Sequence, residues 1–236
     1  PAVEESSLIQ NLKWRAGYLK KYLSSFTVYH FHDTSVSSPM RGDCNINDNE
    51  YLRDNGSNLA AFLYSMMQND ETNFRLIEGV VSSIAPYFKC FKLRPDVNDK
   101  ERIRLEWEEK ETDMYLNGYS FSDGTLRFIA LATLLLQSKT PEVIVIDEPE
   151  LGLHPAAINK FAELVKRASN KSQIILSTQS TNLVNCFDVK DIIVVDRIES
   201  QSVFRHLSEE DLATWMDEYD LSISDLWEKN MIGGQL

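Results

Sequence analysis

The chain has 236 residues, of which 43% are hydrophobic and 25% charged, and its formal net charge is −12 at pH 7. That length suits one large domain with a buried core. The acidic balance makes it a poor general binder of duplex nucleic acid, because such binding depends on neutralising phosphates. No apolar run is long enough to span a membrane, and residues 1–10 lack a signal-peptide pattern. Three widely spaced cysteines fit a reducing compartment. We therefore expect a cytoplasmic protein with no membrane partner.

The first half of the chain predicts loops, two helices and a pair of strands. Asp, Asn, Ser and Gly are concentrated in one stretch, as is typical of loops. Apolar residues then recur at helical spacing in two runs, and a later run alternates apolar with charged residues, as a half-exposed strand does. The expected elements are a loop over 32–58, a helix from 58, a helix over about 74–85, a strand over 103–107 and a partner strand over 113–116.

The second half alternates apolar strands with helices, which indicates a mostly parallel sheet covered by helices on both faces. The expected elements are a buried helix over 122–137, a strand over 143–146, a helix from 155, a strand over 174–176, a short helix over 181–186, a strand over 192–195, an edge strand over 203–205 and a capped acidic helix over 208–218. We divide the chain into an N-terminal segment (1–57), a small helical subdomain with a β-hairpin (58–121) and an α/β core (122–236).

Two consecutive carboxylates end the most apolar strand. Asp147 and Glu148 follow Val143–Ile146 directly, and open α/β sheets bind ligands at the carboxyl ends of their strands. The first carboxylate can hold a magnesium ion, and the second can orient and deprotonate a water molecule beside a γ-phosphate. An ordinary strand ending in an acidic loop is the alternative.

A second polar motif opens the buried helix. Ser122, Asp123, Gly124 and Thr125 combine a hydroxyl, a small residue and the free N–H groups of a helix N-terminus, which together form an anion site. Glycine allows a phosphate to approach the backbone closely. The alternative is a helix start capped by Ser122 or Asp123, in which Gly124 is incidental.

Two further segments lie downstream. Leu151–Pro155 makes a tight connection into the next helix, and Ser177–Ser180 follows the next strand. A polar side chain in the latter segment would reach the same edge of the sheet as Asp147.

These four motifs, in this order, resemble those of ABC-type ATPases of the RecF/SMC-like kind, and their wording is similar to that of bacterial AAA_21-type ATPases. The resemblance is strong over about 115–200. It implies a P-loop NTPase-type α/β fold with ATP and Mg²⁺ as cofactors. It also implies the following roles: nucleotide binding by a signature at Ser122, Asp123, Gly124 and Thr125 and by His154 in the D-loop region, Mg²⁺ binding by Asp147, catalysis by Glu148, and γ-phosphate sensing by the switch residue Gln179.

The family also implies a head-to-tail dimer in which ATP lies between two copies of the chain. Ser122 and Gly124 of one copy would contact the γ-phosphate held by the other. The resemblance implies an ATP-gated switch serving DNA repair or defence, with nucleic acid or an effector protein as a further partner. Gln179 replaces the histidine usual in transporters; an amide can donate to phosphate but cannot carry a proton at neutral pH.

The sequence departs from the family at the phosphate loop. None of the nine glycines begins a G-x-x-x-x-G-K-[ST] pattern. We expect that loop, the Walker A motif, to lie upstream of residue 1. Without its N–H groups and lysine the phosphates lose their main cradle, so this chain alone is expected to bind ATP weakly and not to turn it over.

Three weaker patterns remain. His30, His32 and Asp33 offer a candidate metal site, although we prefer a structural or interface role for them. The basic residues between 89 and 94 are better explained as a solvated surface than as a nucleic-acid site. Residues 233–235 resemble signature letters but no helix follows them, so they predict a flexible end.

Two other functions stay open. A transporter nucleotide-binding domain is disfavoured by the SDGT signature, by the switch glutamine and by the helical pair over 58–85. A non-catalytic interaction module is disfavoured by the intact Asp147–Glu148 pair.

Overall fold

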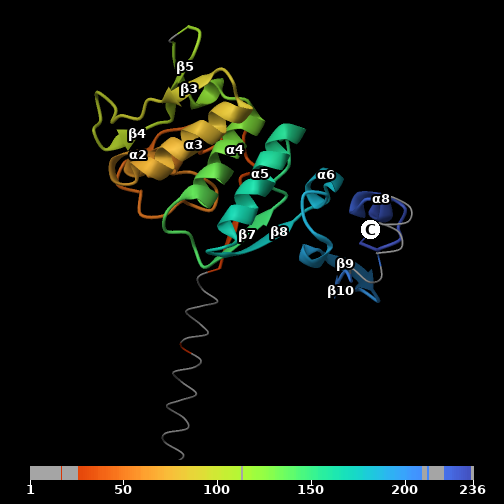
Figure 1. Ribbon diagram of the computed structural model, residues 1–236. Helices are drawn as coiled ribbons and strands as arrows, with labels where there is room; N and C mark the ends of the chain where they lie inside the picture. The colour runs from red at the N-terminus through yellow and green to blue at the C-terminus, as the bar shows by residue number, and fades with distance from the viewer. Residues whose placement is uncertain (1–16, 18–25, 113, 209–211, 213–220, 235–236) are drawn as a thin grey trace, which may run out of the picture.

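The computed structural model describes residues 17, 26–112, 114–208, 212 and 221–234. Three helices lie side by side at its centre: α3 (Glu71–Ile84), α4 (Asp123–Leu136) and α5 (Pro155–Ala168) (Figure 1). The helix α2 (Leu59–Asn69) packs beside α3. Because α4 touches helices on two sides, nearly every one of its side chains is buried, as its apolar sequence predicts.

A parallel sheet contains the strand that ends in Asp147. Its order is β1 (Thr27–Tyr29), β7 (Val143–Asp147) and β8 (Gln173–Ser177), and both pairings are parallel. The predicted fold class, an α/β protein with a parallel sheet flanked by helices, is confirmed. The strand β1 lies in a region where we placed no element, because three residues are too few to show a period.

The two faces of this sheet differ in burial. On one face Tyr29, Ile144 and Ile146 are at most 3% exposed, beneath the helices. On the other face Val28, Val145 and Ile175 form one row across the three strands. Of these, Val28 is 42% and Ile175 is 45% exposed to solvent. Among the described residues this face is therefore not fully covered, and the expectation of helices over both faces is not met.

The predicted strand over 103–107 is two strands with different partners. β4 (Arg102–Ile103) pairs with β2 (Cys44–Asn45), whereas β5 (Glu106–Glu109) pairs with β3 (Phe88–Phe91) and β6 (Tyr115–Asn117). All of these pairings are antiparallel. The alternation of apolar residues continues through the break, so the sequence gives no sign of the change of partner.

An aromatic cluster joins this hairpin to the start of α4. The rings of Trp107 and Phe121 are stacked with centroids 4.6 Å apart, and Phe88 packs against both. The short helix η1 (Gly118–Ser120) leads into Phe121. The residue before Ser122 is thus held in the core.

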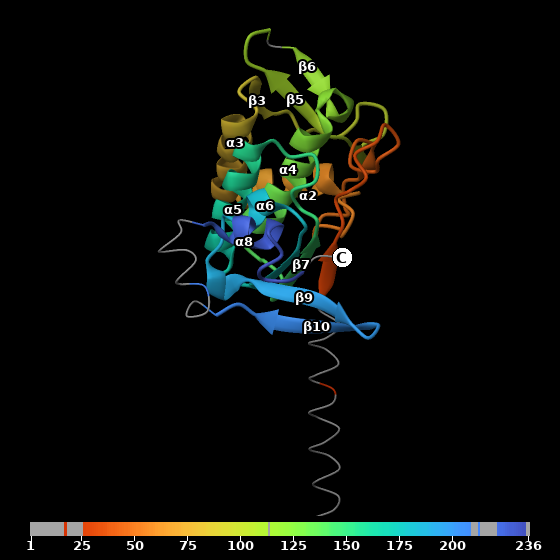
Figure 2. The same ribbon diagram turned by 90° about the vertical axis from the view of Figure 1, so that its right-hand side faces the viewer.

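The C-terminal part has a hydrophobic core of its own. β9 (Ile193–Ile198) and β10 (Gln201–His206) form an antiparallel pair separate from the parallel sheet, so the expected third and edge strands do not join that sheet. Val194 of β9 packs with residues of α6 (Thr181–Val184), η2 (Val189–Asp191) and α8 (Ile223–Glu228). Figure 2 shows this pair at the opposite end of the molecule from β5 and β6.

Two expectations for the C-terminal end have different outcomes. The predicted helix over 208–218 lies almost wholly outside the described residues. Residues 233–234 are not a free end, because the Gly234 N–H donates to Asp196 Oδ1 at 2.6 Å and its carbonyl accepts from the Trp227 ring. Within the described ranges, no helix combines the length and the apolar character required to cross a membrane.

The basic residues between 89 and 94 are paired with acidic residues on β5. Lys89 and Lys92 each place Nζ 2.6 Å from a carboxylate oxygen of Glu108, and Arg94 pairs with Glu106 at 3.3 Å. The hydrogen bonds from Lys89 and Lys92 hold the pKa of Glu108 to about 2, against an ordinary value of 4.5. Because these three basic side chains are paired with carboxylates, they have less positive charge available to bind phosphates.

The Glu108 pairing predicts a loss of stability in acid. A carboxylate whose pKa is lower in the folded than in the unfolded protein stabilises the fold above its unfolded pKa. That stabilisation is lost as the pH falls from 4.5 towards 2. Urea titrations between about pH 6 and pH 3 should therefore show a steeper decline of the unfolding midpoint for the wild type than for Glu108→Gln. Equal declines would contradict this, and Glu163→Gln, exposed on α5, serves as the control.

Candidate functional site

Polar segments follow all three strands of the parallel sheet at the same edge. Asp147 pairs with Ser177 across β7 and β8, and Tyr29 pairs with Ile146 across β1 and β7. His30 therefore follows β1 at the level where Asp147 ends β7. The structure brings Asp147, Glu148 and the segment carrying Gln179 to one edge, as the sequence predicts.

Glu148 has a backbone conformation that residues other than glycine seldom adopt. Its φ is +39°, and such a residue costs about 1–3 kcal/mol unless its surroundings impose the conformation. Its N–H donates to the Ser177 carbonyl at 2.8 Å, which ties the residue to the end of β8. Strain of this kind concentrates at functional sites, so the backbone supports a special role for Glu148.

A hydrogen bond joins the segments after β7 and β8. Thr178 Oγ1 donates to Glu150 Oε1 at 2.5 Å. The next residue, Gln179, has an exposed side chain. The segments that follow β7 and β8 are thus held together, while Gln179 faces solvent.

Ser122 caps α4. Its Oγ accepts from the Thr125 N–H at 3.2 Å and lies 2.8 Å from Thr125 Oγ1. The Thr125 side chain is buried, and its hydroxyl also contacts the Tyr87 hydroxyl at 3.2 Å. Ser122 and Asp123 are exposed. The structure gives Thr125 a capping and packing role, and nucleotide binding by all three stays a prediction.

Arg41 locks the loop that enters α4. The buried guanidinium donates to the Gly118 carbonyl at 2.6 Å, to the Phe121 carbonyl at 2.9 Å and to Asp123 Oδ1 at 2.7 Å. A further bond goes to the Thr34 carbonyl at 2.9 Å. Sequence reasoning missed Arg41, since a loop arginine that binds backbone carbonyls has no characteristic spacing.

Gly124 sits where α4 touches the turn between β7 and α5. A Cβ added at Gly124 would lie 2.4 Å from the Gly152 carbonyl oxygen. Gly152 itself has φ +74°, which favours glycine. Close packing inside the chain therefore requires glycine at 124, and its contact with phosphate stays a prediction.

Gly124→Ala is expected to lower the free energy of unfolding by about 1–3 kcal/mol, as overpacking does. The neighbour that would have to move is backbone, not a flexible side chain. Gly79→Ala is the matched control, because Gly79 lies in α3 and an added Cβ there meets nothing within 4 Å. The free energy of unfolding of the Gly79→Ala control should rise by about 0.5–1 kcal/mol, because alanine favours the helix more than glycine does. Denaturant titration compares them, and equal effects would show that the 124–152 contact is not tight.

His154 caps α5. Its Nδ1 accepts from the Ala156 N–H at 3.2 Å, so the ring proton resides on Nε2, and the residue is exposed. Pro155 is the first helical residue, as predicted. Nucleotide binding by His154 stays a prediction.

Arg127 connects α4 to the segment after β1. Its side chain is buried, and it donates from Nε to the Phe31 carbonyl and from Nη2 to the His32 carbonyl, each at 2.8 Å. A Cβ added at Gly152 would lie 3.1 Å from Arg127 Nη1. Burial lowers the pKa of Arg127, whereas Asp123 and Glu150 raise it. A charged residue within an otherwise apolar helix was the available signal, and sequence reasoning missed it.

The candidate metal set from the sequence needs a correction. Asp33 does not join the histidines, because its Oδ1 accepts from the N–H and the hydroxyl of Ser35. Asp147 takes its place: ligand atoms of His30, His32 and Asp147 all lie within 4.8 Å of one another. His32 Nε2 also lies 2.8 Å from the Asp147 carbonyl oxygen.

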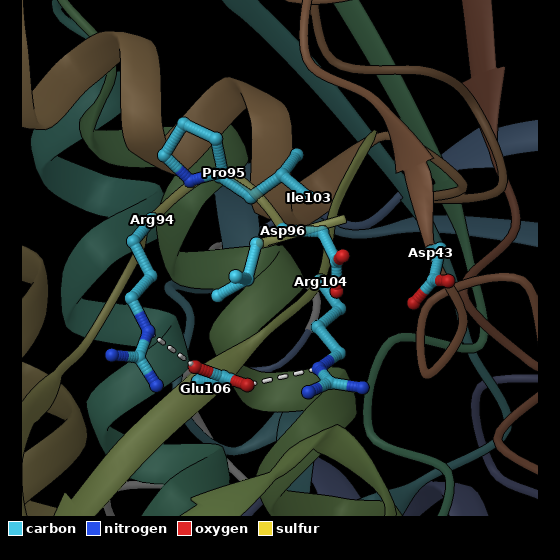
Figure 3. A pocket seen from close by; sticks show the side chains of 8 residues that line it. Asp43, Arg94, Pro95, Asp96, Ile103, Arg104 and Glu106 are labelled. Atoms are coloured by element: carbon cyan, nitrogen blue, oxygen red, sulfur yellow. Dashed lines mark hydrogen bonds and ion pairs between the residues drawn. The ribbon is translucent and has the colours of Figure 1, made fainter. Parts of the chain in front are cut away.

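A pocket elsewhere on the chain contains none of these residues. Figure 3 shows its lining near β4 and β5, where Arg94 and Arg104 both pair with Glu106. Asp43 and Asp96 complete the charged lining. Three carboxylates against two guanidinium groups do not favour an anion, so we place the functional site at the strand ends.

Parts of the chain are similar to known proteins. Residues 33–185 match the AAA_21 family, described as "AAA domain, putative AbiEii toxin, Type IV TA system". The chain is 31% identical over 111 residues to the Old nuclease of Escherichia phage P2, covering 42% of this chain and 19% of that protein. It is 26% identical over 136 residues to the energy-coupling factor transporter ATP-binding protein EcfA2 of Staphylococcus aureus, covering 54% of this chain and 46% of that protein.

A third relative is the ABC transporter A family member 11 of Dictyostelium discoideum, 30% identical over 111 residues, or 42% of this chain and 13% of that protein. The chain thus spans less than half the length of each of these curated relatives. Among solved structures, an Smc head bound to the C-winged helix domain of ScpA matches with a TM-score of 0.51 at 21% identity, covering 64% of this chain and 47% of that one. This last likeness shows the fold alone.

Proposed function

The chain belongs to the AAA_21 family of ABC-type ATPase domains, and from that membership we propose that it is the signature and Walker B part of an ATP-gated dimerisation switch. In this switch two copies associate head to tail around ATP, and hydrolysis separates them. Serving DNA repair or defence is the biological part of the proposal.

The observation that carries the proposal is the meeting of strand ends at one edge of the sheet. Asp147 ends β7 opposite Ser177, and Glu148 follows in a strained conformation that a hydrogen bond to Ser177 maintains. The two carboxylates and Gln179 therefore suit nucleotide chemistry at this edge.

The residues fit the cofactors in part. The half-buried carboxylate of Asp147 is the type of oxygen ligand that Mg²⁺ prefers. Bound Mg²⁺ would supply charge neutralisation on the phosphates. Glu148 would accept the proton of the attacking water, and Gln179 would donate to the γ-phosphate.

The exposed end of α4 completes the site of the other copy. Ser122 and Asp123 face solvent at a helix N-terminus, where N–H groups favour an anion. Gly124 keeps that terminus packed on the turn at Gly152. The turn and the signature of one copy would therefore move as a unit against nucleotide held by its partner.

The test is the oligomeric state of the natural protein carrying Glu148→Gln, which should trap ATP. Sedimentation velocity is expected to show monomers without nucleotide and dimers with ATP and Mg²⁺. Ser122→Arg, added to this variant, should prevent dimerisation, whereas Gln201→Arg, exposed on β10, should not. A protein that stays monomeric with saturating ATP would contradict the proposal.

We also propose that the chain as printed does not turn ATP over, because no Walker A pattern occurs in its sequence. Calorimetric titration of the chain with ATP and Mg²⁺ should give no detectable binding heat. Micromolar binding would mean that other groups hold the phosphates.

A transporter nucleotide-binding domain is the second candidate, because relatives of the chain include transporter ATPases. The signature Ser122–Thr125 and the glutamine at 179 speak against it. Fractionation of cells separates the two: a transporter domain would co-purify with a membrane permease, and the proposed switch would not.

A further inference from the structure

Two histidines and an aspartate meet at the edge of the parallel sheet. His30 and His32 follow β1, and Asp147 ends the neighbouring strand β7. One ligand atom from each lies within 4.8 Å of the other two. The segments are far apart in sequence, so the cluster is a product of folding. From this geometry we propose that His30, His32 and Asp147 bind a divalent first-row transition cation.

The spacing suits one ion. Nitrogen and oxygen ligands lie about 2.0–2.2 Å from a bound zinc ion, which places ligand atoms on the order of 3–4 Å apart. The ligand atoms of the three residues lie within 4.8 Å of one another, so they need to move only a short distance towards each other to bind one ion. His30 is exposed and its ring can rotate to provide that movement, whereas His32 and Asp147 are half-buried.

The backbone around the cluster holds the ligands in position without the ion. His32 Nε2 lies 2.8 Å from the Asp147 carbonyl oxygen, which can only accept. Nε2 therefore donates to that carbonyl, which leaves Nδ1 as the ring nitrogen that an ion can bind. Metal-binding histidines commonly donate their second N–H to a carbonyl in this way.

Two further bonds fix the backbone of the segment. Arg127 donates to the His32 carbonyl at 2.8 Å, and the His30 N–H donates to the Asp54 carbonyl at 2.9 Å. The histidines thus extend from a backbone held at both positions. Because the backbone is already ordered at both positions, metal binding costs less conformational entropy.

The ligand set selects the type of metal. Imidazole nitrogen suits Zn, Cu, Fe and Ni, whereas Mg²⁺ prefers oxygen ligands and gives up its water reluctantly. Two imidazoles and one carboxylate also leave coordination positions open for water or phosphate oxygens. The site shares Asp147 with the proposed Mg²⁺ role. The inference goes beyond the proposed function in the two histidines and in the type of metal, and it requires neither nucleotide nor a second copy.

Titration of the nucleotide-free, untagged chain with Co²⁺ tests the site. Visible absorption reports nitrogen ligation, and calorimetry reports affinity. His30→Ala should weaken Co²⁺ binding about 10- to 100-fold or more, the range known for lost supporting groups of metal sites. His30 is exposed, so this variant should keep its fold, which far-UV circular dichroism verifies.

His32→Ala should weaken binding similarly, and His206→Ala is the matched control, since His206 is exposed on β10. Excess Mg²⁺ should not displace Co²⁺. The proposal is overturned if Co²⁺ does not bind, if the His30 and His32 variants bind as the wild type does, or if Mg²⁺ displaces the ion. ATP-dependent dimerisation is measured separately on the natural protein, so failure of the metal site and failure of the proposed switch are distinguishable.

Discussion

In the natural protein, Glu148→Gln is expected to lower ATP turnover by about 100-fold or more, the contribution typical of a positioned general base. Glutamine has the shape of glutamate but cannot accept the proton from water at neutral pH. The backbone at 148 and its bond to the Ser177 carbonyl do not involve the carboxylate, so the fold should persist. Steady-state hydrolysis measures the loss, and equilibrium binding of ATP should stay close to that of the wild type.

Glu150→Gln is the matched control for this prediction. Glu150 lies two residues away and binds Thr178, which gives its carboxylate a structural partner. Its substitution should reduce turnover much less. If Glu150→Gln abolished hydrolysis and Glu148→Gln did not, the catalytic role would pass to Glu150.

The elements of the second half were predictable because their signals are local. An unbroken apolar run gave β7, and proline at the first helical position with an apolar stripe behind it gave α5. The buried α4 followed from a sequence that is apolar nearly all round. The structure of residues 143–168 is thus predictable from short local patterns, with no knowledge of distant contacts.

The rest of the fold depends on distant partners. Three residues of β1 become a strand only because β7 offers them a free edge. The run over 103–107 divides into β4 and β5 because two different strands pair with it. The strand β9 has the composition of a sheet core, yet it pairs with β10 around a separate cluster.

The candidate site was predictable where one strand supplies the chemistry and unpredictable where the contacts cross the chain. Asp147 and Glu148 could be placed at a strand end from their position alone. The contact between His32 and Asp147 spans 115 residues, so the sequence suggested Asp33 instead. Gly124 illustrates a second limit: the sequence shows a small residue, but only the fold shows Gly152 against it.

Arg127 joins these separate pieces, because one side chain on α4 reaches both the histidine segment and the turn at Gly152. Arg127→Met is expected to lower the free energy of unfolding by about 2–6 kcal/mol, since each of the two carbonyls left without this donor costs about 1–3 kcal/mol. Methionine retains the apolar stem and approximate length. The loss is measured by denaturant unfolding, with intrinsic fluorescence as the signal.

Lys190→Met is the control, because Lys190 and its partner Asp188 are both exposed and surface ion pairs contribute only about 0–1 kcal/mol. Arg127→Lys should recover only part of the loss, since one ammonium cannot reproduce the two planar donors that reach Phe31 and His32. A competing effect has the opposite sign: methionine avoids the cost of burying a charge, which the lowered pKa of Arg127 reflects. An Arg127→Met protein as stable as the wild type would show that this cost cancels the two hydrogen bonds. The arginine would then serve to position the 31–32 segment, not to stabilise the fold.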